Sequence, residues 1–222
     1  MGRKILYHPS AAHFEVSKRA YLDAHPNMSF GEISASVLAI DTTDIHNPRI
    51  LLLQHAANAS DPNKWEPPRD ACKDDDQTIL HAVGRALLVQ AGLGIGFIGG
   101  SVGDPRISTL DDGKKVCQLN FAVVARAADA APLVMRPHPE DPRGAIWAGE
   151  HTELVVKLGS EKHQRSVWAT EDEVKAKKVR DTVLDFTSEE VERTVLLTFQ
   201  YIRDNWNLEC MVKDVEIQAS MG

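Results

Sequence analysis

The sequence has little cysteine and no excess of positive charge. Its 222 residues include three cysteines, Cys72, Cys117 and Cys210. An odd number at such wide spacing forms neither a disulfide framework nor a zinc-binding pattern, which indicates reduced thiols in a cytoplasmic protein. The formal net charge of -7 repels phosphate backbones, so we expect no nucleic-acid partner.

Long apolar runs are also missing. No segment approaches the roughly 20 apolar residues that cross a bilayer, and residues 1–16 lack the apolar stretch of a signal peptide. We therefore expect a cytoplasmic protein with no membrane partner. What the sequence does have is 43% hydrophobic and 26% charged residues, the ordinary mixture of a globular domain with a core.

Short apolar segments bounded by polar residues predict strands. The predicted strands are residues 34–41, 49–55, 94–102, 116–125 and 154–158, and one more that ends at 168–170. Four prolines between residues 128 and 143 predict a loop there.

Helices are predicted in three places. Residues 77–91 have apolar residues at helical spacing, with Asp76 as the expected N-cap and Gly92 as the expected stop. Residues 171–177 predict a short helix and residues 188–206 a long amphipathic one. Strands interrupted by a central and a C-terminal helix indicate an α+β sandwich with a mixed sheet.

The expected organisation is one domain with additions at both ends. Residues 1–30 are polar and mixed, and we interpret them as an N-terminal extension. Residues 31–206 form the predicted domain, and residues 207–222 are a C-terminal tail.

Residues 65–93 resemble the Nudix box and its lead-in. The family pattern is G-x5-E-x7-R-E-U-x-E-E-x-G-U, where U is apolar. Residues 65–68, W-E-P-P, resemble the lead-in W-E-x-P, Arg85 falls on the family arginine, and Gly92-Leu93 matches the closing G-U.

The likeness has further support within the box and beyond it. Residues 78–81 read T-I-L-H, which resembles a variant found in fungal members of the superfamily. Residues 161–164 and 168–174 resemble the closing strand and helix of the family. The resemblance covers roughly residues 30–206 and implies a Nudix-type α/β/α sandwich.

The departures from the family fall on the residues that carry its chemistry. Nudix hydrolases cut diphosphates with a divalent metal, which the glutamates of R-E-x-x-E-E hold on one helical face. Here Ala86, Val89 and Gln90 stand at those glutamates, Gln77 at the upstream one, and residues 69–71 replace the glycine pair. We therefore expect no cofactor, with magnesium needed only by a residual hydrolase.

Three residues are candidates for catalysis, each with a structural alternative. Glu66 is a lone base or ligand, or a carboxylate at a strand edge. His81 is an acid or base because imidazole titrates near neutral pH, or a packed histidine. Arg85 binds an anion, or forms an internal ion pair with Asp70 or Glu66.

Further candidates surround this segment. Those expected to contact a ligand are His55, Trp65, Arg69, Asp70, Ala86, Val89 and Gln90. Weak metal-ligand candidates are Asp74, Asp75 and Asp76, although consecutive acids in a loop are usually solvated. Residues 150–151 and 161–163 are polar clusters interpreted as surface.

Three functional hypotheses follow from the loss of the box carboxylates. The first is a metal-independent isomerase or cyclase acting on a small, fairly apolar metabolite, in fungal secondary metabolism. The second is a residual hydrolase of a diphosphate-linked compound. The third is a non-catalytic ligand-binding module. All three have a small-molecule partner, and Nudix folds often form homodimers.

Overall fold

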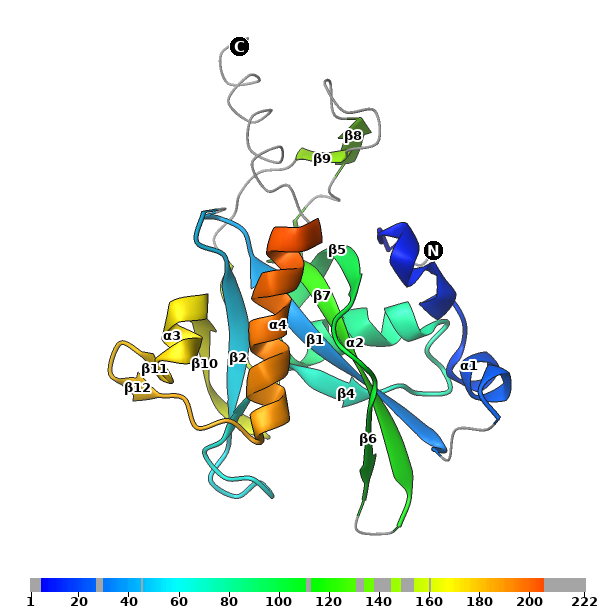
Figure 1. The fold of residues 1–222 in the computed structure, drawn as a ribbon, viewed down its shortest axis with the longest axis horizontal. Coiled ribbons are helices and arrows are strands. Elements are labelled where there is room, and N and C mark those ends of the chain that lie inside the picture. The colour runs from blue at the N-terminus through cyan, green and yellow to red at the C-terminus, as the bar shows by residue number, and fades with distance from the viewer. Residues whose placement is uncertain are drawn as a thin grey trace.

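The computed structural model of this chain describes residues 5–26, 30–44, 46–110, 113–130, 134–137, 145–148, 154–159 and 161–205. An eight-stranded sheet lies at its centre, with α4 (Glu189–Asn205) in front of it and α2 (Ile79–Ala91) behind it (Figure 1). This is the predicted α/β/α sandwich. No helix in the described ranges is long and apolar enough to cross a membrane.

The sheet is mixed, as predicted, because its two central strands run parallel and their neighbours run antiparallel. Its main path is β10 (His163–Ala169), β2 (Arg49–His55), β1 (Glu32–Asp41), β7 (Lys115–Ala127) and β5 (Leu93–Ser101). Three short strands join its sides: β3 (Trp65–Glu66), β4 (Arg69–Ala71) and β6 (Arg106–Thr109). Two separate hairpins pair β8 (Val134–Pro137) with β9 (Ala145–Ala148), and β11 (Lys178–Val179) with β12 (Thr182–Val183).

Two hydrophobic cores form because successive side chains of a strand point to opposite faces. On β1, Ile33 and Val37 belong to the core under α2, while Leu38 and Ile40 belong to the core under α4. The strands are therefore apolar on both faces over much of their length, which is why the sequence presents them as apolar runs.

The N-terminal residues pack onto this domain. A 3-10 helix, η1 (Pro9–Phe14), and α1 (Lys18–Ala24) bury Phe14 and Tyr21 in the core under α2. The ring of Phe14 meets that of Phe121 edge-on at 4.9 Å between centroids. Residues 207–222 lie outside the described part of the chain.

The ends of α2 differ in one respect from the prediction. Gly92 ends the helix in the left-handed conformation, as expected, with φ of 66°. The N-cap is Thr78 rather than Asp76, because the Thr78 hydroxyl accepts from the backbone N–H of His81. Asp76 instead binds Arg85, through Oδ1 and Oδ2.

Residues 154–159 do not form the predicted strand. They run along the C-terminal end of α2, where Lys157 N–H donates to the Ala91 carbonyl at 2.8 Å and Gly159 N–H to the Gln90 carbonyl at 3.3 Å. Leu154, Val156 and Leu158 pack against the core under α2, whereas Val155 is exposed, so this alternation reflects burial without sheet pairing.

The prolines predicted a loop at 128–143, yet β8 lies within that range.

Substitution of Gly159 by alanine should destabilise the fold. A Cβ at this position would overlap the carbonyl oxygen of Val89, a backbone atom that cannot turn away. We expect a loss of about 2 kcal/mol in the free energy of unfolding, measured by urea denaturation. Gly31→Ala is the matched control, because a Cβ there meets nothing within 4 Å. Equal stability of the two variants would contradict this packing.

Candidate functional site

A strip of polar side chains interrupts the apolar face of the sheet that packs on α4. Ser36 of β1 and Gln118 and Asn120 of β7 lie on this face. They point to the same side of the sheet as Leu38 and Ala122, which belong to the core under α4. The parallel register puts Ser36 beside Asn120, and Gln118 Nε2 donates to Asn120 Oδ1 at 3.0 Å. All three are buried, so the sheet presents a polar floor at this end.

A pocket of about 440 Å³ lies between this floor and α4. Its walls carry three guanidinium groups and three carboxylates: Arg69, Arg106, Arg193, Glu66, Asp104 and Glu190. Asp104 and Glu190 are exposed, whereas Glu66 is buried. Arg106 donates to the Ser188 hydroxyl at 3.2 Å. The pocket is thus polar at its floor and charged around its rim.

Glu66 is held in the pocket wall by two hydrogen-bond donors, His55 and Arg69. Its Oε1 accepts from His55 Nε2 at 2.8 Å and from Arg69 Nε at 2.9 Å. Burial alone would raise the pKa of Glu66, but the bond from His55 and the charge of Arg69 outweigh it and lower that pKa. The bond to Glu66 in turn raises the pKa of His55, against the opposing effect of burial. The pair therefore favours its ionised form.

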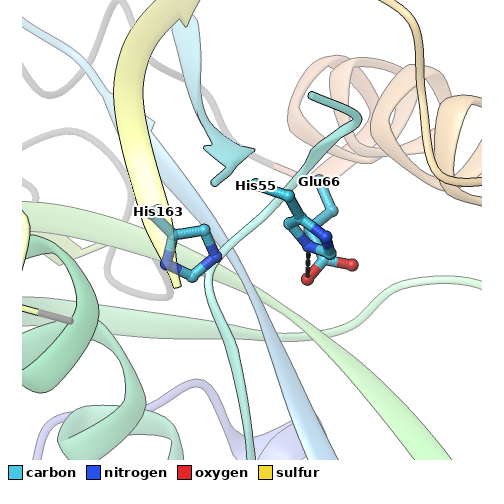
Figure 2. A group of neighbouring side chains, drawn as sticks. All are labelled: His55, Glu66 and His163. Carbon is cyan, nitrogen blue, oxygen red and sulfur yellow. Dashed lines mark hydrogen bonds and ion pairs between the residues drawn. The ribbon is translucent and has the colours of Figure 1, made fainter. Parts of the chain in front are cut away.

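A second histidine completes a buried cluster with this pair. The antiparallel register of β10 and β2 places His163 opposite His55, with ring centroids 5.6 Å apart. One ligand atom from each of His55, Glu66 and His163 lies within 4.8 Å of the other two. Figure 2 shows the three side chains and the bond between His55 and Glu66. Burial, and then the charge of His55, lower the pKa of His163.

The expectation that the protein needs no cofactor is wrong, because the cluster of His55, Glu66 and His163 has the composition of a metal site. Two imidazoles and a carboxylate are metal ligands, and the geometry of this cluster could hold an ion. The sequence did not predict this cluster, because it indicated Glu66 only as a lone base or ligand and weak metal candidates only at residues 74–76. It also indicated a surface position for His163, whereas the side chain is buried.

The box helix itself does not fit the family's metal. Ala86 is buried in the core, Val89 is exposed, and Gln90 is turned to the first residue of β4. There Gln90 Oε1 accepts from the Arg69 N–H at 3.3 Å, and its Nε2 donates to the Arg69 carbonyl. Gln90 thus supports Arg69, and none of the three side chains lines the pocket.

Arg85 and His81, the other two catalytic candidates, lie away from the pocket. Arg85 donates to the carboxylates of Asp70 and Asp76 and to the Ala71 carbonyl. It therefore links α2 to β4 and to the loop between them, a segment called the box loop below. His81 Nδ1 lies 2.8 Å from the Thr78 hydroxyl at the helix cap. The structure therefore brings Glu66 alone of these three to the pocket, and their catalytic roles stay predictions.

The remaining candidates are spread over the structure. Trp65 is fully buried in the core under α4, and its Nε1 donates to the Val183 carbonyl at 3.0 Å. Asp74 is exposed and pairs with Lys18 at 3.3 Å, and Asp75 is exposed as well. Residues 150–151 lie outside the described ranges.

The sequence analysis also missed the residues that form the pocket. The sequence did contain a sign of the polar floor. Ser36 in one apolar strand, and Gln118 and Asn120 two positions apart in another, are polar residues where apolar ones are expected. Arg106 and Arg193 gave no such signal. They come from elements far apart in the sequence, which meet only in the folded chain.

Together, the mixed sheet between two helices and the loop that leads from W-E-P-P into α2 define the Nudix fold. The Nudix domain of NrtR from Shewanella oneidensis, solved with ADP ribose, matches it with a TM-score of 0.52 and 10% identity, over 84% of this chain and 99% of that one. The likeness predicted from the sequence is therefore confirmed at the level of fold.

Two further solved structures match with lower TM-scores. A MutT protein from Methanosarcina mazei shares 19% identity over 79% of this chain and 96% of its own, with a TM-score of 0.46. An Ap4A hydrolase from C. elegans shares 17% identity over 79% of this chain and 100% of its own. Its TM-score is also 0.46. No family model matches the chain, and no curated protein does.

Proposed function

We propose that this chain binds a small phosphate-bearing ligand of the nucleotide type in the pocket between the sheet and α4. The observation that carries the proposal is the polar floor of Ser36, Gln118 and Asn120, with three arginines in the walls above it. A cavity of about 440 Å³ has the size of a small-molecule site.

The chemistry of the walls supports this ligand class. Guanidinium groups bind phosphate oxygens with paired hydrogen bonds. The amides of Gln118 and Asn120 offer both donors and acceptors to a polar ring. This lining does not suit the fairly apolar metabolite of the first sequence hypothesis. The ADP ribose bound by the Shewanella Nudix domain supplies a probe of the right kind.

The state of Glu66 favours binding over acid–base catalysis. A general base works best with a pKa near the working pH, whereas the hydrogen bond from His55 and the charge of Arg69 lower the pKa of Glu66. His81 and Arg85, which would share the chemistry, are engaged in the structure of the box loop and helix cap. We therefore prefer the ligand-binding hypothesis to the metal-independent isomerase or cyclase.

Calorimetric titration with ADP-ribose tests the proposal. Arg106→Met should weaken binding about tenfold, because one charge-assisted hydrogen bond is lost. Arg165→Met is the matched control, since Arg165 bonds the Thr182 hydroxyl at 3.1 Å just as Arg106 bonds that of Ser188, but lies outside this pocket. No heat with the unaltered protein at about 1 mM ligand, or equal loss in both variants, would contradict the proposal.

Hydrolysis of such a ligand is a second candidate. It is favoured by one observation: Glu66 belongs both to the pocket wall and to the buried histidine cluster. Chromatography of the ADP-ribose after incubation separates the two functions, because cleavage of the diphosphate releases AMP and binding alone leaves the ligand intact.

A further inference from the structure

The cluster of His55, Glu66 and His163 is built by three neighbouring strands. β3 pairs antiparallel with β2 and sets Glu66 opposite Leu53. β10 pairs with the other side of β2 and sets His163 opposite His55. The backbone ladders therefore fix the three positions, and no mobile surface loop is needed to assemble them. All three side chains are more than nine-tenths buried.

Two nitrogen atoms in this cluster lack a partner. The Nδ1 atoms of His55 and His163 are buried, and neither has a hydrogen-bond partner among the described residues. A buried polar atom without a partner costs about 1–3 kcal/mol. Two such atoms, on rings whose centroids lie 5.6 Å apart, indicate that these rings bind a further partner.

We propose that His55, Glu66 and His163 bind a divalent transition-metal ion, with zinc best matched to the ligand set. Two imidazoles and one carboxylate are a known zinc combination that leaves one position open. Magnesium prefers octahedral oxygen ligands, so it suits this set poorly. This site differs from the one that the box glutamates form on the helix of the family. It does not depend on the proposed nucleotide ligand.

The distances allow the site after a small adjustment. Zinc bonds of about 2.0–2.1 Å place tetrahedral ligand atoms roughly 3.4 Å apart. The loosest pair here lies within 4.8 Å, so it must close by about 1.4 Å, which rotation of buried rings can supply. Arg69 adds an opposing positive charge, since it donates to Oε1 of Glu66. Because Glu66 also lines the pocket, the ion would lie beside a bound ligand.

Zinc titration of the chelator-stripped chain tests the site by calorimetry, without any nucleotide. We expect one ion per chain, with His163→Gln weakening its binding by about a hundredfold, since even outer partners of a metal site change affinity 10- to 100-fold. His13→Gln is the matched control, because His13 is exposed on η1. Equal affinity in the two variants, or no saturable binding by the unaltered chain, would overturn the proposal. Circular dichroism checks that both variants are folded.

Cobalt(II) provides a second measurement in case His163→Gln does not fold. Bound by the unaltered chain with two imidazoles and a carboxylate, it should give the strong visible absorption of a four-coordinate centre. The weak spectrum of octahedral cobalt would overturn the proposal. Neither result depends on ADP-ribose, so failure of the nucleotide proposal leaves the metal proposal standing, and the reverse also holds.

Discussion

Glu66→Gln should lower the free energy of unfolding by about 3 kcal/mol. The carboxylate is 4% exposed and accepts hydrogen bonds from His55 and Arg69. The substitution leaves His55 buried without its ionic partner, and breaking a buried ion pair typically costs about 3–5 kcal/mol. Arg69 is exposed, which puts the effect at the lower end of that range. Urea denaturation in the presence of a chelator measures the effect on the metal-free chain.

Glu161→Gln is the control for this prediction. Glu161 lies two residues before His163 and undergoes the same change of charge, but its side chain is exposed. We expect its substitution to shift stability by less than about 0.5 kcal/mol. If Glu66→Gln were as stable as this control, the ionic cluster at the pocket wall would not exist as described.

Arg85→Met should cost about 2 kcal/mol, because the guanidinium donates to Asp70, to Asp76 and to a backbone carbonyl. Hydrogen bonds to charged groups contribute about 1.5–3 kcal/mol, and the partial exposure of Arg85 puts the effect at the lower end. Thermal or urea unfolding measures it. Arg19→Met is the control, since Arg19 is exposed on α1. A neutral Arg85→Met variant would contradict a structural role for this arginine.

The same ion pair predicts a dependence on pH. Burial raises the pKa of Asp76, but the bonds from Arg85 and from the Lys73 N–H outweigh it, so that pKa lies below its ordinary value of 3.8. A carboxyl with a lower pKa in the folded chain adds stability above its unfolded pKa and loses it as the pH falls through the folded one. The stability difference between the unaltered chain and Asp76→Asn should therefore shrink below about pH 4. A difference that grows on acidification would contradict the pair.

Periodicity predicted the scaffold well because it records which faces are buried. The strands at residues 49–55 and 116–125, the helix at 77–91 and its stop at Gly92 all appear in the structure. Residues 154–158 show the limit of this signal. They alternate because one side packs on the core, yet their N–H groups bond to the end of α2 instead of a strand.

The site was harder to predict because its parts meet only through sheet pairing. Ala86, Val89 and Gln90 carry no carboxylate, but the pattern at the box could not show that His55, Glu66 and His163 lie together. His55 and His163 are 108 positions apart in the sequence and become neighbours through the register of β2 and β10. Hydrophobic alternation shows which face of each strand is buried, but it does not show that β10 pairs with β2.

The central claim is that ligand binding takes place on the face of the sheet under α4 and away from the box helix. Nuclear magnetic resonance of the labelled chain during titration with ADP-ribose tests it most directly. We expect the largest shifts at the side-chain amides of Gln118 and Asn120 and at the backbone of Ser36. Largest shifts along residues 86–90, with the two amides unchanged, would contradict the claim.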